Sequence, residues 1–255
     1  MIVYSTKKYK RMKKIAVLFL TVLVTSAAAV QVSFGQGNAG DNDALVIRNC
    51  TDFNVTGDGT NDQWKKTDWV FLSHQGSDFI DYKTKVKVLS SPAGIYFLFD
   101  CEDEKLTTTL KGDNLNLWEE DVVELFLWTA EDFPVYFEYE VSPMNYELPI
   151  LVPNYKGKFL GWLPWKYEGD KKVVHATSVR GGEKVSGGKV TAWTAEFFIP
   201  YKLLEPLPQV PPEPGARWRA NMYRIDYDKG AAHFSWKKTS GTFHDYNRFG
   251  TFIFE

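Results

Sequence analysis

The 255-residue sequence contains 30 Lys and Arg residues and 32 Asp and Glu residues. Six of the basic residues and none of the acidic residues precede residue 40, so the chain beyond that point has 24 basic residues, 32 acidic residues and a net charge of −8. Such an acidic chain binds polyanions poorly, which excludes nucleic acid and anionic membrane surfaces from the expected partners.

The N-terminal segment has the three-part pattern of a secretory signal. Basic residues in 7–14 precede an apolar run at 15–24 and small residues at 26–29. The run is too short to span a bilayer, which disfavours the alternative of a transmembrane anchor. No cysteine follows the run directly, so a lipid anchor is not expected. We therefore expect residues 1–30 to be a signal peptide, cleaved within 28–36, and the mature chain to be periplasmic or extracellular with no membrane span.

The remaining chain, residues 40–255, is long enough for one domain with a sizeable core, and its periodicity indicates strands. Short runs of alternating apolar and polar residues recur between Gly, Pro, Asn and Asp clusters. They predict an all-β fold, an antiparallel β-sandwich of the jelly-roll or immunoglobulin-like kind, with little helix beyond one turn near 200–204. The proline-rich segment 206–215 is expected to be a surface loop. The predicted strand segments are 85–89, 95–100, 121–128, 136–141, 173–179, 191–199, 217–226 and 250–254.

Two cysteines and the absence of catalytic motifs limit the chemistry. Cys50 and Cys101 either form a disulfide in an oxidising compartment or remain two buried thiols. The sequence has no G-x-S-x-G, H-E-x-x-H or C-x-x-C motif and no phosphate-binding glycine-rich loop. Its four histidines show no ligand spacing, and we expect most acidic residues on solvated strand faces rather than in a glycosidase pair. No enzymatic activity is expected.

Aromatic residues make up 16% of the sequence and include nine Trp. A flat exposed ring can stack on the apolar C–H face of a sugar while nearby polar groups bond its hydroxyls. Trp193 and Trp218 lie on the apolar register of strands and are expected in the core. The aromatics in loops or at strand ends are either such platforms or plugs at the ends of the sandwich: Trp64, Trp69, Trp118, Trp162, Trp165, Trp236 and Phe243.

The segment 118–127 places an aromatic residue just before a strand that contains a carboxylate among apolar residues. A buried carboxylate needs a partner. Glu124 is therefore expected either in an ion pair with Arg219 or Arg224, or facing a ligand beneath Trp118.

Acidic turns at 56–62 and 100–104 offer oxygen ligands that would suit calcium. Neither matches the EF-hand loop, and ordinary Asx turns are the expected explanation.

Six segments in series resemble family 9 carbohydrate-binding modules, which are related to the DOMON sandwich domains: 118–126, 136–143, 193–200, 218–226, 235–236 and 243–250. The resemblance runs from about Asp52 to the C-terminus. It implies a β-sandwich that binds the ends of oligosaccharides between two aromatic side chains, carries structural calcium and commonly accompanies polysaccharide-degrading enzymes. The calcium ligands are not assigned.

The resemblance also implies site residues. Trp118 matches one aromatic wall, Phe243 stands where the family has the second wall, a Trp, and Glu124 matches a carboxylate that bonds sugar hydroxyls. Glu140 stands where the family has a sugar-binding Arg, which would change the hydroxyls recognised. Trp236 is a further ligand-binding candidate.

The function expected from these features is recognition of an oligosaccharide or polysaccharide, in support of glycan breakdown by separate secreted glycoside hydrolases. One alternative is a b-type haem electron carrier, for which Met144, Met222 and His233 are available, although Met222 is expected in the core. Others are a glycoside hydrolase, and an accessory protein of such hydrolases that has lost sugar binding.

Overall fold

The computed structural model describes residues 44–76, 81–156 and 158–255. The predicted signal peptide lies outside these residues and remains a prediction. The strands are β1 (Ala44–Asn49), β2 (Val70–Gln75), β3 (Thr84–Ser90), β4 (Gly94–Glu102), β5 (Val122–Trp128), β6 (Val135–Val141), β7 (Glu147–Tyr155), β8 (Lys158–Phe159), β9 (Leu163–Pro164), β10 (Val174–Arg180), β11 (Ala192–Pro200), β12 (Arg217–Asp226), β13 (Ala232–Ser235) and β14 (Gly250–Phe254). The helical segments are η2 (Asp62–Lys66), η3 (Leu117–Glu119), η4 (Gly169–Lys171), α1 (Tyr201–Leu204) and η5 (Tyr246–Arg248).

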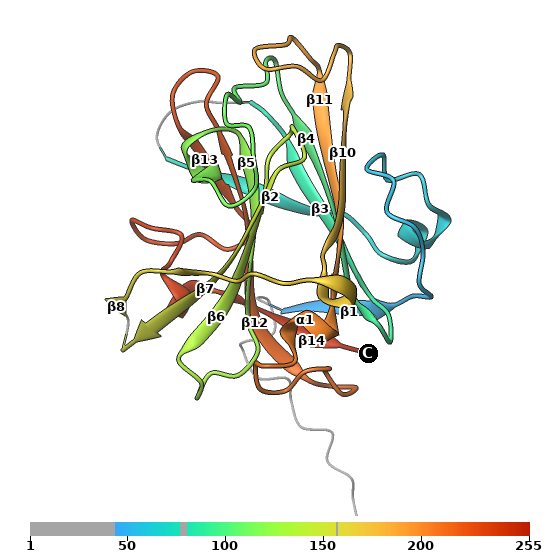
Figure 1. The fold of residues 1–255 in the computed structure, drawn as a ribbon, viewed down its shortest axis with the longest axis vertical. Helices are drawn as coiled ribbons and strands as arrows, with labels where there is room; N and C mark the ends of the chain where they lie inside the picture. Colours follow the sequence, from blue (N-terminus) through green and yellow to red (C-terminus); the bar gives the residue numbers. More distant parts are fainter. Residues whose placement is uncertain (1–43, 77–80, 157) are drawn as a thin grey trace, which may run out of the picture. The chain divides into compact units, whose positions relative to one another are not determined.

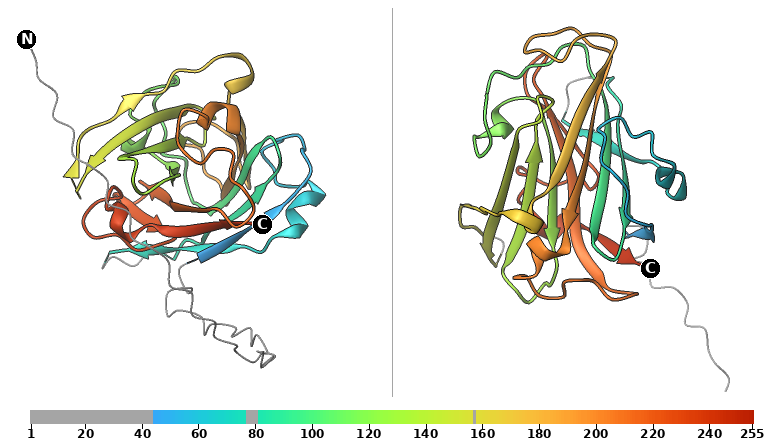
Figure 2. Two further views of the ribbon diagram at one scale, coloured as in Figure 1. Left: turned by 90° about the horizontal axis from the view of Figure 1, so that it is seen from below. Right: turned by 45° about the vertical axis from the view of Figure 1, so that its right-hand side comes forward.

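The strands form two layers (Figures 1 and 2). One layer has the order β7-β6-β5-β12-β14, with β13 beside β12, and the other has the order β10-β11-β4-β3, with β2 beside β3. The layers are joined because β1 pairs in parallel with both β14 and β3, and because β13 pairs with β2. The other strand pairs of the described residues are antiparallel. This confirms the predicted all-β sandwich.

All eight predicted strand segments coincide with strands, and α1 lies at the predicted helical turn. The sequence patterns missed β1, β2, β7 and β13, as well as the two-residue strands β8 and β9. β7 contains Pro149 and Pro153, which lack an amide donor and argue against a central strand. They are tolerated because β7 lies near the edge of its layer, where only the two-residue strands β8 and β9 pair with its outer side. In the described ranges, no helix is both long and apolar enough to cross a membrane.

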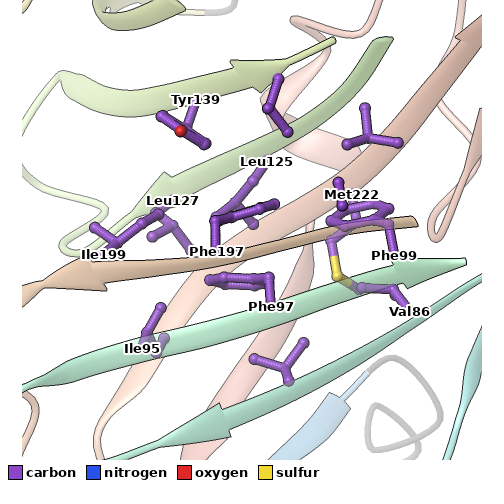
Figure 3. Close-up of a cluster of buried hydrophobic side chains, with 14 of the residues drawn as sticks. Val86, Ile95, Phe97, Phe99, Leu125, Leu127, Tyr139, Phe197, Ile199 and Met222 are labelled. Atoms are coloured by element: carbon purple, nitrogen blue, oxygen red, sulfur yellow. The ribbon is translucent and has the colours of Figure 1, made fainter. Parts of the chain in front are cut away.

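The main hydrophobic core fills the space between the two layers. Figure 3 shows Leu125, Leu127, Tyr139 and Met222 facing Phe97, Phe99 and other side chains of the second layer. Trp193 and Trp218 are fully buried in this core, as predicted, and so is Met222.

The two cysteines are buried free thiols, so the disulfide alternative is wrong. Burial raises the pKa of Cys50 to about 11 and that of Cys101 to about 12. Both thiols therefore stay protonated at neutral pH and behave as small apolar groups.

A second buried face lies on the other side of β5, β6, β7 and β12. Successive residues of a strand point to opposite faces, so the residues that alternate with those of the main core form a separate cluster here. Loops that carry Trp118, Trp162 and Phe243 pack on this cluster. Its buried members are Leu117, Val122, Phe126, Trp128, Tyr136, Leu148, Ile150, Val152, Tyr223, Ile225, Tyr246 and Phe249. This covered face of the sheet holds the candidate site.

Candidate ligand-binding site

A cavity of about 680 Å³ lies over the second buried face, which is within the usual range for small-molecule sites. Its floor comes from β5, β6, β7 and β12, and its sides come from the loop before β5, the segment after β7 and the loop between β13 and β14. Side chains far apart in the sequence therefore meet in one enclosed space.

The structure brings four of the five sequence-predicted site residues to this cavity. Trp118, Glu124, Glu140 and Phe243 all line it. Trp236 does not. Its ring packs 5.6 Å, centroid to centroid, from the ring of Phe252, on the edge of the main core. Trp236 was predicted as a site residue because it lies in one of the segments that resemble the family. In the structure, its indole packs against the main core instead.

Aromatic rings form two sides of the cavity. On one side, Trp118 and Trp162 meet edge to face, with centroids 5.7 Å apart. On the other, Phe243 stacks on Tyr223 at 4.0 Å and meets the edge of His233 at 5.4 Å. Trp118, Trp162 and Phe243 are each only half-buried, so part of each ring remains available to a ligand. These contacts fix the orientation of the rings before any ligand binds.

Three carboxylates form much of the floor. Glu124 on β5 lies directly opposite Glu140 on β6, and Glu138 is two residues along β6 on the same face. Glu124 and Glu138 are each 3% exposed and Glu140 is fully buried. The expectation that acidic residues occupy solvated strand faces is therefore wrong for Glu138, whereas Glu124 and Glu140 were predicted as site residues. It failed because loops far away in the sequence cover this face.

Glu124 forms no ion pair with either predicted arginine. Arg224 binds Asp103 and Asp226 on the other face of the sheet, and Arg219 pairs with Glu131. The ion-pair alternative is wrong, and Glu124 faces the cavity instead.

Hydrogen-bond donors are scarce at the floor carboxylates. Oε2 of Glu138 and both carboxylate oxygens of Glu140 are buried without a hydrogen-bond partner in the described part of the chain. Burial raises the pKa of Glu124 to about 8. Burial also raises the pKa values of Glu138 and Glu140 well above their usual range, and the neighbouring carboxylates add to this by repulsion. The floor therefore favours protonated over ionised carboxyl groups.

The basic side chains of the lining do not neutralise these acids. Burial lowers the pKa of His244 to about 4, and its Nδ1 lies 2.6 Å from the hydroxyl of Tyr136 and 3.8 Å from Oε2 of Glu138. Burial and the neighbouring His74 lower the pKa of His233. Both lining histidines are therefore uncharged at neutral pH, and Lys238 is exposed at the rim.

Sequence reasoning missed several of the lining residues, among them Glu138, Phe159, His244 and Gln75. For Glu138 a signal existed, since it shares its strand face with Glu140. Nothing local in the sequence indicates that Phe159 and His244 stack, at 4.2 Å between centroids, because their loops are far apart in the chain.

The predicted acidic turns are explained by local hydrogen bonds. Asp58 accepts hydrogen bonds from Thr56 and from the backbone and hydroxyl of Thr60, as expected for an Asx turn. In the second segment, Asp103 accepts a hydrogen bond from the backbone amide of Lys105, whereas Asp100 lies in β4 and is paired with Lys85 and Arg180 of other strands.

One group of three side chains in the described residues could hold a metal ion such as calcium: Asp103, Asp226 and Asp228. The guanidinium of Arg224 already contacts Asp103 at 3.1 Å and Asp226 at 2.5 Å. A cationic side chain thus occupies the place that a metal ion would take. The group does not fit calcium, and the calcium implied by the family resemblance stays a prediction without ligands.

Comparisons with known proteins give the fold but no close relative. No protein-family model matches the chain, and no curated protein matches it significantly. Among solved structures, a protein of Bacteroides uniformis described as a candidate carbohydrate-binding protein is 16% identical, with a TM-score of 0.65, over 84% of this chain and 99% of its own.

Two structures of a family 9 carbohydrate-binding module from Caldicellulosiruptor kristjanssonii, one with cellotriose and one with glucose, are 15% and 14% identical to this chain. Each has a TM-score of 0.56 over 83% of this chain, and the matches cover 93% and 95% of their own chains. The chain therefore has the fold of family 9 carbohydrate-binding modules.

Proposed function

We propose that the protein binds a carbohydrate in the cavity over β5, β6 and β12. The observation that carries this proposal is the lining itself, in which half-buried rings of Trp118, Trp162 and Phe243 stand over a floor of buried carboxylates. Apolar sugar faces stack on aromatic rings, and hydroxyl donors bond carboxylate oxygens. A purely apolar ligand would leave the floor carboxylates without hydrogen-bond donors. A purely polar ligand would make no stacking contact with the aromatic rings.

The structural neighbours support the same class of ligand. The Caldicellulosiruptor kristjanssonii modules that share this fold were solved with cellotriose and with glucose. Two features argue for a different preference here, since Glu140 replaces a donor of the family by an acceptor and Phe243 replaces an indole by a smaller ring.

Binding is favoured over catalysis by where the acids lie. A glycosidase needs two carboxyl groups on either side of the scissile bond. Glu124, Glu138 and Glu140 all project from one face of one sheet into the floor of the cavity, so they do not lie on two sides of a bound ligand. We expect no release of reducing sugar when the protein is incubated with an oligosaccharide it binds, and measurable turnover would favour a hydrolase.

The haem alternative is disfavoured by the position of Met222, which is buried between the two layers on the opposite side of β12 from the cavity that His233 lines. The two side chains cannot ligate one haem from those positions. An absorption spectrum of the purified protein without a haem band is the expected result.

The proposal includes export through the predicted signal peptide and cooperation with separate secreted glycoside hydrolases. The N-terminal pattern supports export. When the full chain is produced in a bacterial host, the mature protein is expected in the periplasm or medium, with an N-terminus generated by cleavage within 28–36. Retention of Met1 would contradict export.

The site is tested by isothermal titration with neutral, N-acetylated and amino oligosaccharides of equal length. The Trp118→Ala variant is expected to lose about tenfold or more in affinity for the best ligand, because a stacking surface is removed. Trp69→Ala is the matched control, since that indole lies outside the cavity, beneath Lys85 and Lys87. Binding to no member of the panel would contradict carbohydrate binding, and unchanged affinity in Trp118→Ala would contradict the site.

A further inference from the structure

The floor of the cavity holds more acceptors than the protein satisfies. Three buried carboxylate oxygens, Oε2 of Glu138 and both oxygens of Glu140, have no hydrogen-bond partner among the described residues. An unpaired buried acid destabilises a folded protein, and an apolar residue of similar size would fit the same place at lower cost. Acids kept at such positions point to a ligand that satisfies them.

We propose that the ligand is a sugar bearing a free amino group, with its ammonium held by Glu138 and Glu140 and its ring between the aromatic sides of the cavity. This inference rests on the proposed carbohydrate binding and specifies the sugar class. An ammonium group carries three hydrogen-bond donors and no acceptor. Such a group can donate to both Glu138 and Glu140, whose buried oxygens have no partner among the described residues.

Charge supports an organic cation. Glu124 adds a third carboxylate to the floor, directly across from Glu140. When these groups ionise, no buried cation of the described lining balances them, because its histidines are uncharged at neutral pH and Lys238 is exposed at the rim. The faces of the lining aromatic rings also attract a cation, which a neutral sugar would not exploit.

A metal ion fits the floor less well. A bound calcium ion has oxygen ligands at roughly 2.3–2.6 Å, so those oxygens lie within about 5 Å of one another. Within the described residues, that criterion is met only by Asp103, Asp226 and Asp228, which lie elsewhere. The carboxylates of Glu124, Glu138 and Glu140 do not meet that criterion together, whereas an ammonium group can donate to Glu138 and Glu140 without a third acid at that distance.

A sugar rather than a simple amine is favoured by the other lining groups. The side-chain amide nitrogen of Gln75 is a buried donor without a partner among the described residues, while its oxygen accepts from Thr239. A sugar hydroxyl offers an acceptor to that donor, whereas an alkyl ammonium offers none. The aromatic sides likewise need a ring with apolar faces.

Binding is expected to release protons. The raised pKa values of the floor carboxyls favour their protonated form in the absence of a cation, and an ammonium ligand stabilises the ionised form. The other groups that face them stay uncharged, since burial lowers the pKa values of His233 and His244 and raises those of Tyr136, Tyr223 and Tyr227. Lys238 lies exposed at the rim. Affinity for the amino sugar therefore rises with pH between about 5 and 7, by at most about tenfold per unit for each proton released.

The experiment is a titration of the full domain at pH 7 with four ligands: glucosamine oligomers, N-acetylglucosamine oligomers, glucose oligomers of the same β-1,4 linkage and length, and putrescine. Glucosamine oligomers are expected to bind at least about tenfold more tightly than the other three, as for a charge-assisted contact. Repeating the titration in buffers of different ionisation enthalpy is expected to show proton release for the amino sugar and none for the glucose oligomer.

Two substitutions in the floor test whether these carboxylates hold the ammonium group. Glu138→Gln and Glu140→Gln are each expected to lose at least about tenfold in affinity for the glucosamine oligomer and to change little toward any neutral oligomer that binds. Glu131→Gln is the matched control, because Glu131 is exposed and lies outside the cavity lining. Unchanged affinity in both floor variants would overturn the assignment.

The remaining outcomes separate this inference from the proposed function. Equal or tighter binding of the neutral oligomers overturns the amino-sugar inference and leaves carbohydrate binding in place. Putrescine binding as tightly as the glucosamine oligomer overturns the sugar part of the inference. Failure of every saccharide to bind overturns both proposals.

Discussion

Two sets of buried carboxylates lie on opposite faces of the sheet that contains β5, β6 and β12, and they differ in whether a cation accompanies them. On the face toward the main core, Arg224 binds Asp103 and Asp226 and also donates to the hydroxyl of Thr84. On the cavity face, Glu138 and Glu140 have oxygens without a partner among the described residues. The first set stabilises the fold, and the second set is the one that we propose binds a ligand.

The two sets differ in their pairing because successive residues of β12 point to opposite faces of the sheet. Arg224 pairs in register with Val123, and its neighbour Tyr223 pairs with Glu124. Because alternate residues point to opposite faces, the arginine that lies nearest to Glu124 in the register is directed away from it. The two-residue spacing that places Arg224 beside Asp226 therefore also directs Arg224 away from Glu124.

The largest expected effect comes from removing the cation of the satisfied set. Arg224→Met should lower the free energy of unfolding by about 3–5 kcal/mol, because it leaves buried carboxylates without their partner. Denaturant unfolding measures this. The matched control is Arg180→Met, which removes a half-exposed pair with Asp100 and should cost about 0–1 kcal/mol. Similar losses in the two variants would contradict the structural role of the buried cluster.

A smaller effect of opposite sign is expected on the cavity face. Folding raises the pKa of Glu124 from 4.5 to about 8, so the folded state binds more protons than the unfolded state between those pH values. Stability from this group is complete below about pH 4.5 and falls as pH rises toward 8. Glu124→Gln should therefore match the wild-type protein near pH 4 and exceed its free energy of unfolding by about 1–3 kcal/mol at pH 8.

Urea unfolding at pH 4, 6 and 8 checks this difference. Burial also raises the pKa values of Asp103 and Asp121, with the same sign. Those groups remain in both proteins, so subtracting the two curves leaves the contribution of Glu124 and of its repulsion with Glu138 and Glu140. A difference that does not grow with pH would show that the cavity acids are satisfied in the free protein.

The aromatic side of the cavity should contribute less to binding than the acids. Phe243→Leu keeps an apolar side chain but removes the ring, and it should weaken oligosaccharide affinity by about 0.5–1.5 kcal/mol, or roughly 2- to 13-fold. Phe71→Leu is the matched control, because Phe71 is an exposed phenyl on β2 outside the cavity lining. Equal affinity in the two variants would remove Phe243 from the site.

The smallest expected effect concerns the rim. Lys238→Met should strengthen binding of an amino sugar by about 0.2–1 kcal/mol, because an exposed like charge is removed, and high salt should abolish the gain. Lys166→Met, at an exposed lysine outside the cavity, should change nothing. Weaker binding in Lys238→Met would mean that the rim lysine bonds the ligand.

The sequence by itself determined the local features of this protein. Strand alternation predicted the sandwich, the burial of Trp193 and Trp218, and the separation of Glu124 from the core residues of its strand. These predictions hold because period-two alternation depends only on neighbouring residues in a strand. β7 escaped prediction because its prolines are tolerated only at the edge of a layer, and nothing local indicates where the edge lies.

Only the tertiary structure decided the site. The register of β5 and β6 placed Glu140 opposite Glu124, and distant loops buried both beneath Trp118 and Phe243. The same packing directed Arg224 to other acids and placed Trp236 against the core. Pairing register and loop packing arise from contacts between residues far apart in the chain, so whether an acid is solvated, paired or left open to a ligand is not set by its neighbours in sequence.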